Sequence, residues 1–464
     1  MKFLKKGKFK ILEKLQEILG KEKVLLEEEE LLSYSYDASS LIRKPLAVIL
    51  PEKKEEVVEV LKWIKKHQIP LTPRGSGTST TGSALAHSAG IILCFSKMNR
   101  ILELDEEERV VRVEPGVING ELKSYLKKFR LFYPPDPASM NFSTIGGNVA
   151  TGAGGPRGLK YGTTKDYVLA LEVVLPGGEV LKTGPTTLKG VVPYNLTPIF
   201  IGSEGTLGVF TEIFLKVLPL PEKRVLFLSF HSLEEEPLEL LSQMLKRGLT
   251  PASSEFVDKT SLKALVQIQK VKELLPLDSL TKALFFVEFD GTHLEIKDLV
   301  PKIERFYFEK GIRVIKAEKE EEIESLWEIR RTLAPALKVL GSLKIADDVV
   351  VPRKFMKIFL TEIRKLEKES KLPIVCFGHA GDGNFHVNLL FEEEKKEIAK
   401  EVREKILKKV LELSGTISGE HGLGYTKRTY INWELSSLQI EIMKKIKKIF
   451  DPDNLLNPWV KLPD

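Results

Sequence analysis

Hydrophobic positions in the first hundred residues alternate between short apolar runs and a helical spacing. Residues 46–50 form an apolar run that ends at Pro51, and apolar side chains then recur at positions 57, 60, 61 and 64. This recurrence places them on one face of a helix. A second apolar run spans residues 90–95. The pattern therefore predicts strand, helix and strand, as in a mixed α/β sheet.

The next part of the chain carries further strand patterns around one long polar segment. Residues 110–116 alternate in polarity and end in a turn, and a helical spacing follows near Leu122. Residues 134–162 are rich in Gly, Pro, Ser and Thr and show little apolar periodicity, which predicts a long loop. A loop of this length inside a compact domain is usually functional. Strands are predicted again at 170–175 and 208–213.

A boundary signal, Leu-Pro-Leu-Pro, stands at residues 218–221. Beyond it, strand patterns at 225–230 and 284–289 alternate with long helices, which predicts an antiparallel sheet with helices on one face. The character changes again to a helical tail near residue 414. We therefore predict an α+β protein divided into residues 1–220, 221–413 and 414–464.

Composition narrows the class without naming a function. A chain of 464 residues is too long for one core. The net charge of +6 is small, and interleaved Lys and Glu predict solvated helix faces and no nucleic-acid partner. The two cysteines, Cys94 and Cys376, imply no disulfide framework, and no apolar run is long enough to span a bilayer. We expect a cytoplasmic protein, with any contact to the inner face of a membrane made through a partner.

Two glycine-rich segments hold three of the seven histidines. His379 and His386 bracket one segment, and Glu420 and His421 are adjacent in the other. Neutral imidazoles together with a carboxylate suit a divalent ion such as Zn²⁺, Mn²⁺ or Fe²⁺. The alternative is that these are loop histidines with ordinary hydrogen bonds, although such clusters between glycines rarely serve a core.

Glycines make a fold-back between the first two histidines feasible. Gly381 and Gly383 can adopt positive φ, so the chain can turn and bring His379 and His386 together. His386 and Asn388 are two residues apart, and on a strand both side chains would lie on one face.

Three loops of small residues predict a second site. The loop Arg74–Ser79 lacks the lysine of a Walker A loop and the third glycine of a dinucleotide fingerprint, yet it can still surround a phosphate. Residues 144–151 and 202–208 form two similar loops. Glycine lets the backbone approach a planar ligand, and Asn, Ser and Thr supply polar contacts. Three such loops favour an extended ligand over a lone phosphate.

The three loops together resemble the flavin-binding half of the FAD oxidoreductases of the vanillyl-alcohol oxidase and p-cresol methylhydroxylase type. The two histidine segments and residues 454–458 narrow the resemblance to the branch of the glycolate oxidase flavin subunit, D-lactate dehydrogenase and D-2-hydroxyglutarate dehydrogenase. It extends from about residue 40 to the end. It implies an FAD-binding domain at 1–220 with an N-terminal helix and two subdomains, a substrate or cap domain at 221–413, and a tail that returns to the first domain.

The resemblance also implies the residues that contact FAD. These are Arg74, Gly75, Ser76, Gly77, Thr78, Ser79, Thr144, Gly147, Asn148, Glu204, Gly208, Val209 and Asn457. Some relatives attach FAD through a histidine in the glycine loop, whereas this chain has Thr78, Ser79 and Thr80 there. Non-covalent FAD is therefore expected, and His87 is interpreted as structural.

The same resemblance gives roles to the histidine cluster. It places His379, His386 and Glu420 on a divalent metal, Asn388 near the substrate, and His421 as the general base. A metal that chelates a 2-hydroxy acid lowers the pKa of the hydroxyl group, and a histidine accepts the proton near neutral pH.

Arg330 matches the arginine that this branch uses for the substrate carboxylate, and a guanidinium suits that group. The alternative is a surface arginine paired with Glu328 or its neighbours.

The expected function is an FAD-dependent and metal-dependent dehydrogenase of the D-lactate, glycolate or D-2-hydroxyglutarate class, which passes a hydride to flavin N5. Electrons would leave to a quinone, an electron-transfer flavoprotein or an iron–sulfur subunit, because two cysteines cannot build a cluster. We expect a homodimer. The alternatives are an ether-lipid synthase-like flavoenzyme without net oxidation, and a flavin-bearing subunit of a multi-chain oxidase.

Overall fold

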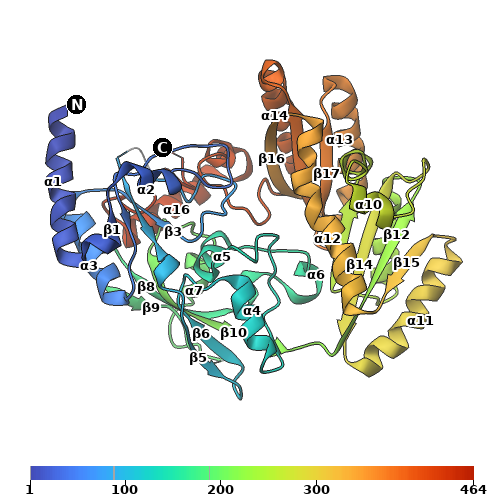
Figure 1. The fold of residues 1–464 in the computed structure, drawn as a ribbon, viewed down its shortest axis with the longest axis horizontal. Coiled ribbons are helices and arrows are strands. Elements are labelled where there is room, and N and C mark those ends of the chain that lie inside the picture. Colours follow the sequence, from blue (N-terminus) through green and yellow to red (C-terminus); the bar gives the residue numbers. More distant parts are fainter. Residues whose placement is uncertain (1, 87–88, 188, 464) are drawn as a thin grey trace. The chain divides into compact units, whose positions relative to one another are not determined.

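A computed structural model describes residues 2–86, 89–187 and 189–463. The chain divides into two compact units. Unit 1 contains Met1–Ala153, Thr163–Pro219 and Glu420–Asp464, and unit 2 contains Gly154–Gly162 and Leu220–Gly419. Figure 1 shows the elements of both units in chain colours.

Unit 1 contains a mixed sheet and an antiparallel sheet. The mixed sheet runs in the order β1 (Val24–Leu25), β2 (Val48–Ile49), β4 (Ile91–Cys94) and β3 (Leu71–Arg74), and β2, β4 and β3 are parallel. The second sheet runs in the order β5 (Ile101–Asp105), β6 (Val110–Val113), β10 (Val209–Lys216), β8 (Val168–Val174) and β9 (Val180–Lys182). A short pair joins β7 (Leu131–Phe132) to β11 (Leu218–Pro219).

Unit 1 also contains helices, most of which are labelled in Figure 1. They are α1 (Lys2–Leu19), α2 (Glu28–Ser33), α3 (Lys54–His67), α4 (Asn119–Lys127), α5 (Ile145–Thr151), α7 (Thr197–Phe200), α15 (Ile431–Glu434) and α16 (Ser437–Phe450). Val57, Val60 and Ile64 of α3 lie in one apolar core with Ile91 and Leu93 of β4. The predicted strand, helix and strand are therefore confirmed.

Residues 134–162 differ from the predicted loop, because α5 and α6 (Gly158–Tyr161) lie within them. The Thr144 side chain accepts the N–H of Gly147 and begins α5, and Gly152 ends it in the left-handed conformation. Ile145 and Val149 are buried on one side of α5. A helix of this length shows only two periodic apolar positions, so the sequence pattern did not reveal it.

Unit 2 is built on one large antiparallel sheet, and the α+β fold class is confirmed. The strands follow the order β15 (Val314–Ala317), β12 (Lys223–His231), β14 (Ala283–Gly291), β13 (Ser253–Val257), β17 (Ile374–His379), β18 (Asn384–Phe391) and β16 (Leu343–Val350). Besides α6, the helices are α8 (Glu236–Lys246), α9 (Lys259–Leu265), α10 (Gln269–Leu274), α11 (His293–Glu309), α12 (Glu320–Ala336), α13 (Met356–Ser370) and α14 (Lys396–Glu412).

Helices cover both faces of this sheet, so the predicted single covered face was wrong. Phe286 of β14 stacks on Trp327 of α12, with ring centroids 5.8 Å apart. Phe227 of β12 stacks on Tyr307 of α11 at 5.7 Å. Phe227 pairs with Val287, the neighbour of Phe286, and successive strand residues face opposite sides. Both odd-numbered and even-numbered positions of β12 and β14 are largely apolar, which is the sequence signal for a sheet buried on both faces.

The divisions between the units differ from the predicted ones at two places. Residues 154–162 belong to unit 2, because Arg157 binds Asp290 at 2.9 Å and Glu288 at 2.8 Å. Residues 414–419 also belong to unit 2, since Thr416 pairs with Val350 of β16.

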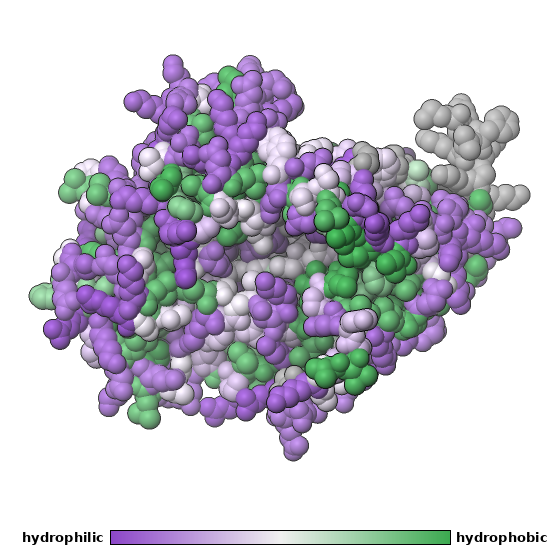
Figure 2. All heavy atoms as spheres, turned by 180° about the vertical axis from the view of Figure 1, so that it is seen from behind, coloured by the Kyte–Doolittle hydropathy of each residue, from purple (hydrophilic) through white to green (hydrophobic). Residues whose placement is uncertain are grey.

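The face of the molecule in Figure 2 is mostly hydrophilic, with apolar side chains gathered in separate patches. Lys and Glu pair along helix surfaces, as Lys400 and Glu397 do on α14 at 2.7 Å. Among the described residues, no helix combines the length and the hydrophobicity that a membrane span requires.

Candidate functional site

The β17–β18 hairpin places His379 and His386 close together. His379 pairs with Asn384 across the hairpin, and Phe377 pairs with His386, so both histidines lie on one face of the sheet. Their ring centroids are 5.1 Å apart. Gly383 has a φ of 79°, and a Cβ atom there would clash with the carbonyl oxygen of Val351. The turn that joins the two strands therefore requires glycine at this position.

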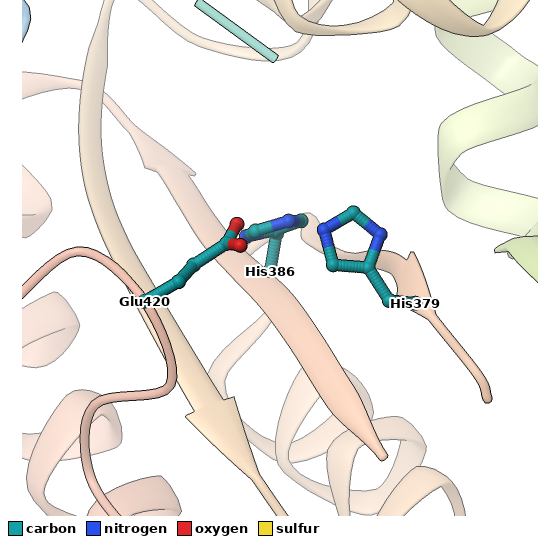
Figure 3. A group of neighbouring side chains, drawn as sticks. All are labelled: His379, His386 and Glu420. Atoms are coloured by element: carbon teal, nitrogen blue, oxygen red, sulfur yellow. The ribbon is translucent and has the colours of Figure 1, made fainter. Parts of the chain in front are cut away.

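Glu420 lies near the two histidines. It directly follows residues 414–419, which run beside β16. Its neighbour Gly419, the last residue of unit 2, donates its N–H to Asp348 of β16 at 2.8 Å. The ligand atoms of His379, His386 and Glu420 all lie within 4.8 Å of one another. Figure 3 shows the three side chains pointing toward one common point. Two imidazoles and a carboxylate at this separation form a donor set that fits a divalent metal ion.

Glu255 is a member of the site that the sequence analysis missed. It lies on β13 directly beside His379 of β17 and is 1% exposed. Its carboxylate forms a short hydrogen bond with Nδ1 of His379. Burial alone would raise the pKa of Glu255, but the charges of His379 and Arg330 outweigh it and hold the pKa at about 2. The available signal was one acidic residue inside the otherwise uncharged strand Ser253–Val257.

Arg330 is held by Glu255 and not by Glu328. Its Nη2 and Nε atoms lie 2.6 and 2.8 Å from Oε2 of Glu255. The guanidinium also lies over the ring of Phe377, 4.6 Å from the centroid. Glu328 pairs instead with Lys270. The surface interpretation of Arg330 was therefore wrong, because its side chain is only 13% exposed.

Asn388 and His421 lie beside members of the cluster. Asn388 is on the same face of β18 as His386, and its Nδ2 donates to the carbonyl oxygen of His386 at 3.4 Å. Nε2 of His421 lies 3.7 Å from Oε1 of Glu420. Their roles stay predictions.

The three predicted flavin loops all belong to unit 1. The side chain of Arg74 is turned under its own loop and donates to the carbonyl oxygens of Tyr36 and Ala84, at 2.8 and 3.1 Å. A Cβ atom on Gly75 would clash with the hydroxyl of Thr144, so the first two loops lie against each other. The guanidinium of Arg74 therefore connects the loop to two neighbouring segments of unit 1.

Two buried polar atoms in the same region fit the binding of a polar cofactor. Within the described residues, Nδ2 of Asn148 and Oγ of Ser203 are buried and have no hydrogen-bond partner. A buried polar atom without a partner is costly. Asn148 lies within α5, and Ser203 lies in the third loop. Nδ2 of Asn148 can donate to a polar cofactor, and the hydroxyl of Ser203 can donate to it or accept from it.

The third loop and the tail are bound to each other through Glu204 and Asn457. The carboxylate of Glu204 accepts the N–H groups of Leu423 and Gly424, at 3.0 and 2.8 Å. Nδ2 of Asn457 donates to the carbonyl oxygens of Ser83 and Glu204, each at 2.9 Å. Both side chains therefore hold protein segments together, and any contact they make with FAD stays a prediction.

The remaining predicted cofactor residues differ in what they expose. Gly208 is packed so tightly on Val173 that a Cβ atom has no room, and Val209 is buried in the core. The predicted contact of these two residues with FAD would therefore have to be made through the backbone. The hydroxyl of Ser79 lies 2.8 Å from the hydroxyl of Ser83, just beyond the loop. His87 lies outside the described residues.

Two family descriptions match this chain. Residues 45–184 match the FAD binding domain, and residues 220–460 match the C-terminal domain of FAD linked oxidases. The chain is 39% identical over 433 residues to the glycolate oxidase subunit GlcD of Bacillus subtilis, covering 92% of this chain and 91% of that protein. It is 36% identical to the D-lactate dehydrogenase of Anaerostipes hadrus, covering 97% and 96% of the two chains.

Solved structures share the fold at lower identity. p-Cresol methylhydroxylase with bound substrate matches with a TM-score of 0.78 and 18% identity, over 98% of this chain and 97% of that one. Alkyldihydroxyacetonephosphate synthase matches with a TM-score of 0.75 and 18% identity, over 97% and 84% of the two chains. These likenesses concern the fold alone.

Proposed function

This chain belongs to the FAD-linked oxidoreductases of the glycolate oxidase, D-lactate dehydrogenase and D-2-hydroxyglutarate dehydrogenase group, and from this membership we propose that it oxidises a D-2-hydroxy acid to the 2-oxo acid. The observation that carries the proposal is the clustering of His379, His386 and Glu420 within 4.8 Å in a chain with an FAD-binding domain. Two imidazoles and a carboxylate are suited to a metal that chelates a hydroxy acid.

The roles of the residues follow from the chemistry of the reaction. The three loops would hold FAD non-covalently, and the flavin would supply the acceptor for the hydride from Cα. His379, His386 and Glu420 would hold a divalent metal ion, which would lower the pKa of the substrate hydroxyl. His421 accepts the hydroxyl proton at an imidazole nitrogen, since an imidazole is basic near neutral pH. Arg330 binds the substrate carboxylate, and Asn388 contacts the substrate beside it.

We propose that the reduced protein passes its electrons to a separate acceptor, such as a quinone, an electron-transfer flavoprotein or an iron–sulfur subunit. Relatives carry the name of a glycolate oxidase subunit, which supports a role within a multi-chain complex. The two cysteines of this chain are both buried and too few for a cluster of its own.

The test is direct reduction of the flavin. The purified protein, supplied with Zn²⁺ or Mn²⁺ under anaerobic conditions, is mixed with D-lactate, glycolate or D-2-hydroxyglutarate while the visible spectrum is recorded. Bleaching of the flavin band by a D-acid, and not by its L-enantiomer, is expected. Absence of bleaching with every 2-hydroxy acid would refute the proposal and leave a non-oxidative flavoenzyme as the alternative.

The assignment of the base is tested separately with His421→Ala. Loss of a general base lowers the rate of flavin reduction by roughly 10²–10⁴-fold. His293→Ala is the control, because His293 is exposed at the start of α11. A His421→Ala protein that reduces its flavin at the parent rate would remove His421 from the mechanism.

A further inference from the structure

Glu255 binds two site residues with one buried carboxylate: one oxygen contacts His379 and the other contacts Arg330. We infer that Glu255 is a positioning residue that fixes which nitrogen of His379 faces the metal and which edge of Arg330 faces the substrate. This inference rests on the proposed function, and it adds to that function a residue that belongs to neither the metal ligands nor the substrate contacts.

The first consequence concerns the ring of His379. Glu255 binds Nδ1, so a metal on His379 would be bound through Nε2. Figure 3 shows one ring nitrogen of His379 facing His386 and Glu420 and the other facing away. A carboxylate that accepts the second N–H of a ligating histidine fixes its tautomer and ring orientation and raises its basicity. Glu255 does this from the adjacent strand, where the backbone register β13–β17 sets its position.

The second consequence concerns the guanidinium of Arg330. Nε and Nη2 both lie on the same oxygen of Glu255, at 2.8 and 2.6 Å. This edge is therefore committed to the protein. A substrate carboxylate meets the remaining edge, formed by Nη1 and the outer N–H of Nη2, because a guanidinium presents its donors as a rigid planar fork. The ring of Phe377 beneath the guanidinium keeps that plane fixed.

The arrangement explains why a carboxylate and not an amide stands at position 255. Both partners of Glu255 are largely buried, and a buried arginine without a counter-charge is costly. An amide would offer the N–H of His379 only a neutral and weaker acceptor, and its NH2 group would have to face one of the two partners. It would also leave Arg330 without a counter-charge and free to turn away. The charge is thus needed for both partners, because it balances Arg330 and makes a strong acceptor for His379.

The experiment compares E255Q with the parent holoprotein in a measurement that does not depend on turnover. The Kd for Zn²⁺ is determined by competition with a chromophoric chelator, and the absorption of Co²⁺ in the same site is recorded. Loss of such a partner weakens metal binding by roughly 10–100-fold. We also expect a changed Co²⁺ spectrum and a raised KM for the 2-hydroxy acid, with unchanged flavin content.

The matched control is E288Q. Glu288 lies in the same sheet, is fully buried and binds Arg157, Arg224 and Trp327, and its contacts in the described part of the chain include no histidine. E288Q therefore measures how much stability is lost when a buried carboxylate becomes an amide, and we expect its Zn²⁺ Kd to equal that of the parent. If E255Q does not fold, the double variant E255Q/R330M removes the unbalanced charge and is expected to show the same loss of metal affinity.

The outcomes separate this inference from the proposed function. A parent protein that binds no metal, or whose flavin is not reduced by any 2-hydroxy acid, refutes the proposed function. A parent that does both, beside an E255Q protein or double variant whose Zn²⁺ Kd stays within twofold of the parent, overturns the role of Glu255 alone.

Discussion

Glu204 joins a flavin loop to the segment that carries His421. Its carboxylate accepts the backbone N–H groups of Leu423 and Gly424, and its own N–H donates to the carbonyl oxygen of Ala150. The residue is almost fully buried and adopts a positive φ of 56°. The family resemblance implies that Glu204 contacts FAD, whereas its carboxylate is directed at the segment of the proposed base.

We therefore expect Glu204→Gln to slow flavin reduction. The NH2 group of Gln would face one of the two backbone N–H groups, so one hydrogen bond is lost. A hydrogen bond to a charged group is worth about 1.5–3 kcal/mol. That loss corresponds to a roughly 10–100-fold slower reduction in stopped-flow measurements. Glu114→Gln is the control, because Glu114 is a buried carboxylate of unit 1 that accepts the N–H of Arg100. Equal rates for Glu204→Gln and the control would contradict the prediction.

His231 gives the molecule a predictable pH dependence of stability. It is buried on β12, with Nε2 2.9 Å from Oγ of Ser229 and Nδ1 3.4 Å from Glu236. Burial lowers its pKa to about 4 despite the opposing effect of Glu236. The unfolded chain, with a pKa near 6.5, binds more protons between these values, so stability is lost as the pH falls through this window.

At pH 5 this group costs about 2 kcal/mol relative to pH 7.5, and the cost is absent in His231→Gln. Urea unfolding of both proteins at the two pH values measures the difference. An identical pH dependence for parent and variant would show that His231 is not responsible.

Individual site residues could be predicted only where the sequence carries a local pattern. His379, His386 and Glu420 stand among glycines, and the structure brings them together. Glu255 and Glu204 act through partners far away in the chain, so no local spacing marks them. The pairing of β13 with β17 places Glu255 beside His379. The sequence of either strand alone does not predict this pairing.

The β17–β18 hairpin is the element that sets the distance between the two histidines. Its turn depends on Gly383, where both the positive φ and the nearby carbonyl oxygen of Val351 exclude a side chain. We expect Gly383→Ala to lower the free energy of unfolding by about 3 kcal/mol or more and to weaken Zn²⁺ binding, because the turn must open.

Gly248→Ala is the control, because it adds the conformational strain of a positive φ without a clash between the new Cβ atom and its surroundings. Gly248 has a similar φ of 75°, but a Cβ atom there would meet nothing within 4 Å. Only the conformational cost of about 1–2 kcal/mol applies, and the Zn²⁺ affinity is unchanged. Urea unfolding and chelator competition measure both variants, and equal destabilisation with equal Zn²⁺ affinity would refute the special role of the Gly383 turn.

Most strands and long helices could be predicted, because their apolar positions recur over several turns or alternate over several residues. The exceptions have a physical reason. The short helix α5 is fixed by the cap at Thr144 and the end at Gly152, and it contains too few residues for a periodic signal. Several strands of unit 2 carry apolar side chains on both faces, which indicates that both faces of the sheet are buried. The sequence prediction nevertheless placed helices on one face only.

At the scale of the whole molecule, the chain leaves and re-enters its two units. Residues 154–162 join unit 2 through the ion pairs of Arg157 and Lys160, although the segments on both sides belong to unit 1. Apolar periodicity reports which face of an element is buried, but it does not report which unit buries it. This part of the architecture therefore required the structure.

The tail closes unit 1 through a buried ion pair. Lys447 of α16 pairs with Asp451 and donates to the carbonyl oxygens of Thr206 and Leu456, each at 2.7 Å. Thr206 belongs to the third flavin loop, and Leu456 precedes Asn457, whose amide holds Glu204 of the same loop. One ammonium group thus fixes two segments that lie about 250 residues apart.

We expect Asp451→Asn to destabilise unit 1 and weaken FAD binding without touching a predicted cofactor residue. Breaking a buried ion pair costs about 3–5 kcal/mol, because the ammonium of Lys447 stays buried without its counter-charge. Fluorescence titration with FAD is expected to give a Kd at least about tenfold higher. Glu441→Gln removes the exposed partner of Lys445 on the same helix and is expected to change stability by less than about 1 kcal/mol. An Asp451→Asn protein that binds FAD as tightly as Glu441→Gln would show that the tail does not support the flavin loops.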